Sequence, residues 1–272
     1  MKGNKKGLES YCRSLGYSRV SYYKRKKIEL KRKKEEKELL EKVKSYRKRQ
    51  PLVGVRKLQK MLSNNGIKVG RDRLFRILRK QGLLVKRKKK YIKTTNSQHR
   101  FRVHKNIIKG IKLNRPNHVY VADITYIRTK EGFSYLSLLT DKYSRKIVGY
   151  NLSRSLGVEG CLKALKMAIK ELKGRKEIIH HSDRGLQYCT NIYTNMLRKN
   201  NIRISMTEEN HIYENSLAER VNGILKNELL LGTEYLTYTE AKVMIKEAVD
   251  IYNNERLHLS LNYITPAVLH AA

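Results

Sequence analysis

The sequence has few cysteines, no long apolar run and few acidic residues. Its three cysteines, Cys12, Cys161 and Cys189, are scattered and form no CxxC pair, which argues against a disulfide framework and a structural zinc site. No apolar run approaches the ~18–20 residues that a membrane span requires, and residues 1–12 carry charge without the apolar centre of a secretion signal. These absences predict a soluble, intracellular protein without a membrane partner.

The shortage of acidic residues is concentrated at one end of the chain. The 272 residues include 61 Lys or Arg and 24 Asp or Glu, for a net charge of +37. Residues 1–113 hold 39 basic and 7 acidic residues, a net of +32, whereas residues 114–272 hold 22 and 17, a net of +5. Such an excess indicates a polyanionic partner, most simply nucleic acid. A basic tail or an acidic membrane surface is the alternative, but the basic end also carries helical patterns.

The basic end is predicted to contain helices. Residues 8–27 indicate two short helices broken at Gly16, with Ser18 as the N-cap of the second. Residues 31–49 are highly charged with few apolar positions, and we interpret them as an exposed linking helix.

Residues 54–84 show a sharper pattern of helix, turn and helix. Apolar residues recur at helical spacing on both sides of the turn "NNGIKVG". The second helix has basic residues around its outward side: Arg71, Arg73, Arg76, Arg79 and Lys80. A basic second helix of this kind is typical of helix-turn-helix proteins that place it in the DNA major groove. A plain helical hairpin is the alternative, and the neighbouring basic run 85–93 favours DNA binding.

Strands alternate with helices from residue 117 onwards. Five segments are predicted to be strands: 118–129, 134–144, 146–153, 177–182 and 202–206. Helices are predicted between and after the last strands, the final two at about 216–231 and 239–252. The order β-β-β-α-β-α-β-α-α predicts an α/β fold with a mixed five-stranded sheet and helices on its faces.

These patterns divide the chain into four segments. We expect a basic helical module with its linking helix at 1–45, a helix-turn-helix-like module at 46–93, a basic linker at 94–115, and a catalytic core with C-terminal helices at 116–272.

Three acidic residues of the core are candidates for a shared site. Asp123 lies inside the first strand, where it could equally be a solvent-facing residue, and Asp183 ends the fourth strand, where it could form a turn. Glu219 could close a capping box with Ser216 at the start of a helix. If the first and fourth strands are neighbours, the two aspartates meet at one edge of the sheet. Three carboxylates around a cleft suit a pair of divalent cations ~3.5–4 Å apart, which clamp the attacking and leaving oxygens of a phosphodiester.

The spacing of these residues matches a known family. Between Asp183 and Glu219 lie 35 residues, and Lys226 follows Glu219 by seven. This resembles the DDE signature of retroviral integrases and insertion-sequence transposases. The segments "VADITYI", "LLTDKYSRKIVGY", "HHSDRGLQY", "ENSLAERVNGILKNEL" and "IYNNERLHLSLNYITP" resemble the integrase-like catalytic protein of insertion sequences whose transposase is split over two overlapping reading frames. The upstream helical segments also resemble that protein, so the resemblance covers nearly the whole chain.

The resemblance implies a ribonuclease-H-like core that uses two Mg²⁺ or Mn²⁺ ions per active site to cleave and join DNA at element ends. By matching position, Asp123, Asp183 and Glu219 would be the catalytic metal ligands. Lys226 would contact DNA near them, although it could be an ordinary solvated lysine. Asn215 would contact DNA or substrate, or it would cap its helix.

The implied partners are double-stranded DNA, as element ends and target, and further copies of the chain. An upstream-frame protein or a frameshift fusion is also possible within such a system, and the location would be the bacterial cytoplasm, associated with the nucleoid. Two other readings of the residues stay open: a helix-turn-helix regulator without catalysis, and a ribonuclease-H-like nuclease that cleaves without joining.

The sequence departs from the family pattern at three places. Tyr120 stands where tryptophan is frequent, and "HIYENS" replaces a more glycine-rich segment before Glu219. His180 and His181 lack the partner cysteines of a His/Cys zinc module. We interpret His181 as a residue that supports the site or contacts DNA, with a plain strand-end residue as the alternative.

Overall fold

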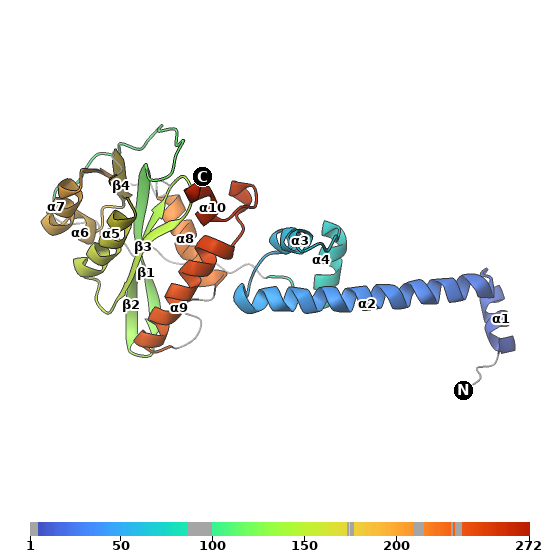
Figure 1. Ribbon diagram of the computed structural model, residues 1–272. Coiled ribbons are helices and arrows are strands. Elements are labelled where there is room, and N and C mark those ends of the chain that lie inside the picture. Colours follow the sequence, from blue (N-terminus) through green and yellow to red (C-terminus); the bar gives the residue numbers. More distant parts are fainter. Residues whose placement is uncertain are drawn as a thin grey trace.

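The computed structural model describes residues 5–85, 100–172, 174, 177–208, 215–229, 231 and 236–272. Helices α1 to α4 form an elongated N-terminal part, and a sheet with helices on both faces forms the remainder (Figure 1). Within the described residues, no helix is both long and apolar enough to cross a membrane.

Helices α1 (Lys5–Ser14) and α2 (Arg19–Arg49) meet at the predicted break. Gly16 adopts a φ of +70°, and the Ser18 side chain caps α2 by accepting a 3.1 Å hydrogen bond from Ser21 N. Helix α2 then continues for 31 residues, through both the expected second short helix and the expected linking helix, and ends before Pro51. It forms one helix because this stretch contains neither Gly nor Pro. The linking helix is only partly exposed, because Leu39 and Val43 are buried.

The two helices of the helix-turn-helix pattern are confirmed as α3 (Val55–Asn64) and α4 (Arg71–Lys80). They enclose a small core with the C-terminal half of α2. Its most completely buried residues are Val43, Leu58, Leu62, Leu74 and Leu78. We call α3, α4 and this half of α2 the helix-turn-helix module.

The predicted mixed five-stranded sheet is confirmed. Its strands are β1 (Val119–Thr129), β2 (Gly132–Asp141), β3 (Ile147–Ser153), β4 (Ile178–Ser182) and β5 (Ile202–Met206). Their order is β3-β2-β1-β4-β5. The first three strands form an antiparallel meander, while β4 runs parallel to both β1 and β5. The first and fourth strands are therefore central neighbours, as the position of the carboxylates requires.

Helices cover both faces of the sheet. Helices α5 (Val158–Leu172), α6 (Leu186–Cys189) and α7 (Asn191–Lys199) pack on one face, around Tyr120 and Ala122 of β1. Helices α8 (Ser216–Asn227) and α9 (Tyr238–Asp250) pack on the other, around Ile127 of β1. A π-helix (Ile251–Glu255), a 3-10 helix (Leu259–Leu261) and α10 (Pro266–Ala271) follow α9.

The described part of the basic linker, residues 100–115, packs against the sheet. Ile108 is buried with Val119 and Ile179, and the backbone N–H of Ile107 donates a 3.1 Å hydrogen bond to Oγ of Ser205. The rest of the expected linker, with the basic run 86–93, lies outside the described residues.

Candidate active site

The sheet register brings the two aspartates together. Tyr120 pairs with His180, and Val121 pairs with His181, in the parallel β1–β4 ladder. Asp123 and Asp183 each follow the last paired residues of this ladder by two positions, so both lie at the same end of the two neighbouring strands. Both side chains are partly exposed.

Asp123 is held on both of its carboxylate oxygens. Asn222 Nδ2 donates a 2.7 Å hydrogen bond to Oδ2, and the backbone N–H of Ile124 donates a 2.9 Å bond to Oδ1. Burial and the negative charge of Asp183 raise the pKa of Asp123 to about 7, and Glu219 adds to the rise. The structure therefore brings the three predicted carboxylates into one electrostatic cluster.

Glu219 does not close a capping box with Ser216. Helix α8 has Asn215 at its N-cap position, one residue before Ser216, and this cap lacks a side-chain hydrogen bond. The Asn215 side chain instead donates a 3.0 Å bond to the carbonyl of Ala122, which ties the start of α8 to β1 beside Asp123. Glu219 is exposed in the first turn of α8, so its carboxylate remains accessible to the cluster.

Asp183 is oriented by the turn that follows it. The backbone N–H of Gly185 donates a 3.0 Å hydrogen bond to its Oδ1. A Cβ atom at position 185 would lie 2.9 Å from the same oxygen, so the carboxylate occupies the space that a side chain would need. Gly185 thus leaves room for this carboxylate position, while its φ of −61° is open to other residues.

Lys226 lies two helical turns after Glu219 and reaches the same cluster. Burial lowers the pKa of its amine, and the charge of Asp123 opposes that shift. The interaction with Asp123 argues against a purely solvated lysine.

The donor set of the cluster suits a hard divalent cation. Among the residues that the structure describes, no three His, Cys, Asp or Glu side chains stand close enough to form a complete metal-binding group. The three carboxylates nevertheless offer the oxygen atoms that Mg²⁺ and Mn²⁺ prefer. Burial, together with the charges of Asp183 and Glu219, raises the pKa of Asp123, and a bound cation would relieve the repulsion between the carboxylates.

The two histidines of β4 are buried on opposite sides of the sheet. His180 Nε2 lies 2.9 Å from the Tyr193 hydroxyl, and burial lowers the pKa of His180 to about 3. His181 Nδ1 lies 2.9 Å from Oγ of Ser205. Both rings are almost completely buried, so neither can contact DNA in this arrangement.

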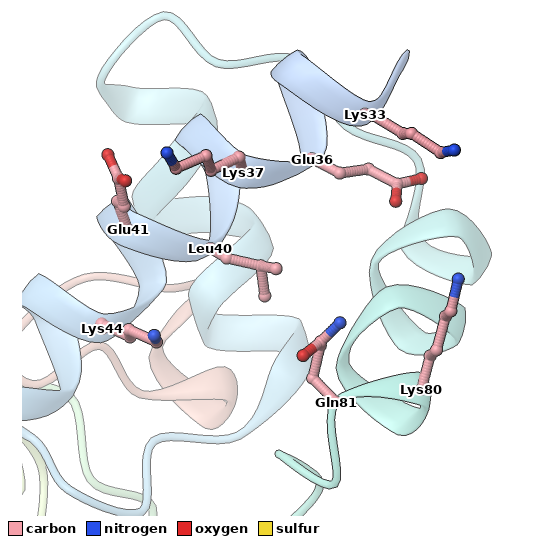
Figure 2. A pocket seen from close by; sticks show the side chains of 8 residues that line it. All are labelled: Lys33, Glu36, Lys37, Leu40, Glu41, Lys44, Lys80 and Gln81. Atoms are coloured by element: carbon pink, nitrogen blue, oxygen red, sulfur yellow. The ribbon is translucent and has the colours of Figure 1, made fainter. Parts of the chain in front are cut away.

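The five basic residues predicted to read DNA are all exposed on α4: Arg71, Arg73, Arg76, Arg79 and Lys80. Two of them also contact acidic residues. Arg71 pairs with Asp72 at 2.9 Å, and Arg73 pairs with Glu35 of α2 at 3.2 Å. Figure 2 shows a groove between α2 and the end of α4, lined by Lys33, Glu36, Lys37, Leu40, Glu41, Lys44, Lys80 and Gln81. Lysines on both walls give this groove a positive charge.

The residues missed by sequence reasoning are those that hold the carboxylates. Asn222 lies three residues after Glu219, in the segment "AERVNGILK", and helical spacing places it near the same face. The helical spacing from Glu219 was the feature of the sequence that could have indicated Asn222. Its contact with Asp123 depends on how α8 packs against β1.

Both parts of the chain match known protein families. Residues 114–211 and 200–266 match the family described as "Integrase core domain". Residues 34–91 match the family described as "HTH-like domain", a range that covers the helix-turn-helix module.

Two similar proteins are products of insertion sequences, and each aligns with most of this chain. An uncharacterized 31 kDa protein of insertion element IS600 from Shigella sonnei is 38% identical over 94% of this chain and 96% of its own. The transposase for insertion sequence element IS629 from Shigella sonnei is 30% identical over 82% of this chain and 75% of its own.

Among solved structures, an integrase assembly shares the fold. A chain of the simian T-cell lymphotropic virus intasome, solved with PP2A regulatory subunit B56 gamma, superposes with a TM-score of 0.50 at 19% identity, over 79% of this chain and 70% of that one. This likeness confirms the expected integrase-type fold. The chain therefore belongs to the family of insertion-sequence transposases with an integrase core domain.

Proposed function

We propose that this protein binds the terminal inverted repeats of its insertion sequence and catalyses metal-dependent cleavage and strand transfer at the element ends. The observation that carries this proposal is the coupling of Asp123, Asp183 and Glu219 on an integrase-type sheet. Burial and the charge of Asp183 raise the pKa of Asp123 to about 7, and a bound cation would favour its ionised form.

The three carboxylates would hold two Mg²⁺ or Mn²⁺ ions as catalytic ligands. When bound, these ions activate water for cleavage or a DNA 3′-hydroxyl for joining, and they neutralise charge on the phosphate. Asn222 fixes the orientation of Asp123, and Asn215 fixes the start of α8, which carries Glu219. Asn215 is buried, so a DNA contact by its Oδ1 would require the start of α8 to open.

Lys226 would supply a positive charge to the DNA backbone beside the carboxylates. The half-buried amine, on which the charge of Asp123 acts, supports this role.

The basic N-terminal part would provide DNA recognition. Segments 1–45 and 46–93 would bind the repeat, 94–115 would link them to the core, and 116–272 would carry the chemistry. Helix α4 would lie in the major groove, with its five exposed basic residues on bases and phosphates.

Further copies of the chain are proposed as partners, because joining requires two DNA ends to be held together. An upstream-frame protein or a frameshift fusion would act in the same complex. A protein that acts on chromosomal DNA in this way would be found in the bacterial cytoplasm, associated with the nucleoid.

The test uses the purified chain, a duplex carrying one end of its element, a target duplex and Mg²⁺. Asp123→Asn and Asp183→Asn should abolish both cleavage and joining while DNA affinity is retained. Undiminished cleavage in these variants would contradict the assignment. Cleavage without joined product in the parent would favour a nuclease, and binding without cleavage would favour a regulator.

A further inference from the structure

A buried charge cluster joins the helix-turn-helix module to the core. Lys57 of α3 places Nζ 3.0 Å from both carboxylate oxygens of Glu228. Arg256 donates to the same carboxylate from Nε at 2.6 Å and from Nη2 at 3.0 Å. One carboxylate thus receives a cation from each part of the protein. We call Lys57, Glu228 and Arg256 the interdomain clamp.

The clamp is shielded from solvent. The side chains of Lys57 and Arg256 are 8% and 4% exposed, and that of Glu228 is 26% exposed. Burial opposes ionisation of Glu228, but Arg256 and Lys57 outweigh it and lower the pKa of the carboxyl. Burial and the charge of Arg256 lower the pKa of Lys57 to about 8, which still leaves the amine mostly charged at neutral pH.

Backbone and side-chain contacts surround the clamp. The N–H of Leu52 donates a 3.3 Å hydrogen bond to the Glu228 carbonyl. Arg49, at the end of α2, donates to both carboxylate oxygens of Glu255, and the Gln50 side chain reaches the Glu255 carbonyl. The module is therefore attached at two acidic residues of the core, Glu228 and Glu255.

A buried ion pair is a poor way to gain stability. Desolvating the charges offsets most of the attraction, and an apolar contact of similar size often stabilises a protein as well or better. What an ion pair with several directed hydrogen bonds does provide is a defined relative position of the two surfaces that it joins. The interdomain clamp is therefore suited to fixing the position of the helix-turn-helix module relative to the core.

The position of Glu228 in the chain determines which helices the interdomain clamp holds together. It directly follows the last turn of α8, the helix that carries Glu219, Asn222 and Lys226. Lys57 belongs to α3, which packs against the proposed reading helix α4. A short chain of contacts thus connects the helix that reads DNA with the helix that carries a catalytic carboxylate. Figure 1 shows α3 and α4 beside the C-terminal half of α2, at the end of that helix that lies next to the core.

We propose that the Lys57–Glu228 contact determines where the DNA is cut, by fixing the distance between the sequence read by α4 and the phosphodiester presented to the carboxylates. The inference rests on the proposed function and names a positioning pair for it. Neither residue touches the reacting atoms, so breaking their contact should change the position of cleavage more than its chemistry.

The test compares Lys57→Met with Lys57→Arg, which keeps the charge. Lys146→Met is the control, since Lys146 forms a 2.8 Å ion pair with Glu171 that lies within the core and away from the helix-turn-helix module. Cleavage of an end-labelled duplex carrying the element end is mapped to single nucleotides in Mg²⁺. In Lys57→Met, the ratio of the principal cut to neighbouring cuts should fall about tenfold, with DNA affinity within about twofold of the parent. Lys57→Arg and Lys146→Met should keep the parent pattern.

A second measurement reads the geometry without catalysis. Hydroxyl-radical footprints of the same duplex should show the α4 footprint unchanged in Lys57→Met, while the protection due to the core becomes spread over several positions. An equal loss of all products without a change in position, or an unchanged cleavage pattern and footprint, would overturn the inference. A parent chain that gives the footprints but no cleavage would contradict the proposed function alone. Thermal melting confirms that each variant is folded, and Lys57→Gln replaces Lys57→Met if the latter is not.

Discussion

The side-chain amide of Asn222 donates a 2.7 Å hydrogen bond to Oδ2 of Asp123, and so joins α8 to the central strand of the sheet inside the carboxylate cluster. The two residues are 99 positions apart in the chain. This bond also lowers the pKa of Asp123, against the rise that burial and the other carboxylates cause.

Asn222→Ala is therefore expected to raise the pKa of Asp123 further and to reduce cleavage. Loss of a residue that orients a metal ligand typically costs about 10- to 100-fold in metal affinity or activity. The loss should be greatest below pH 7, where more of Asp123 would be protonated, and smaller at higher pH. Cleavage rates measured across pH and Mg²⁺ concentration test this. A loss of the same size at every pH would show that the bond acts only on local structure.

The free energy of unfolding of the metal-free protein is expected to depend on Asp123. Its folded-state pKa of about 7 lies above the ordinary value of 3.8. The folded state therefore binds the proton more tightly, so the stabilisation is complete below pH 3.8 and is lost as pH rises through about 7. Mg²⁺ should then raise the melting temperature more at pH 8 than at pH 6. Asp123→Asn should remove this difference, and an equal shift at both pH values in the parent would contradict it.

Arg76→Ala tests the role of α4 in DNA binding. Removing one phosphate contact should weaken binding and reduce the slope of log affinity against log salt by about one. Equilibrium binding to the end duplex, measured between low and physiological salt, gives both values. Lys166→Ala is the matched control, because Lys166 is an exposed lysine on α5. An unchanged slope in Arg76→Ala would exclude Arg76 as a phosphate contact.

Gly185→Ala and Gly223→Ala form a matched pair of substitutions. At position 185 a Cβ atom would meet Asp183 Oδ1 at 2.9 Å, so the carboxylate must shift and cleavage should fall. At position 223, within α8, the nearest atom in reach is Asn227 Nδ2 at 3.9 Å, and alanine should stabilise the helix by about 0.5–1 kcal/mol. Cleavage rates and chemical denaturation separate the two effects. Full activity in Gly185→Ala would show that Asp183 tolerates displacement.

The sequence predicted the elements of the core well because its periodicities are local. The order of the elements also allowed the first and fourth strands to be neighbours, and the sheet order confirms that they are. Helix boundaries were harder. The alternative of a capping box at Ser216 was wrong. Asn215 takes the N-cap position, and its side chain donates a hydrogen bond to the Ala122 carbonyl.

Contacts between distant segments could not be predicted from pattern. Lys57 and Glu228 are 171 positions apart, and each alone has the sequence signature of a solvated charge. His180 and His181 were ambiguous for a similar reason. A polar residue at the end of a strand is exposed or buried according to what covers it, and here Tyr193 covers one and Ser205 lies against the other.

The length of α2 has a consequence for how its outer end responds to a polyanion. The buried residues of this helix, Leu39 and Val43, lie in its C-terminal half, while residues 19–34 contain nine basic residues and one acidic residue. Like charges one turn apart destabilise a helix, and packing is the main source of stability for helices in proteins. Neutralisation of these charges and helix formation are therefore linked equilibria, each of which favours the other. DNA bound along residues 19–34, which span about 24 Å as a helix of sixteen residues, would therefore stabilise the part of α2 that is attached to α1.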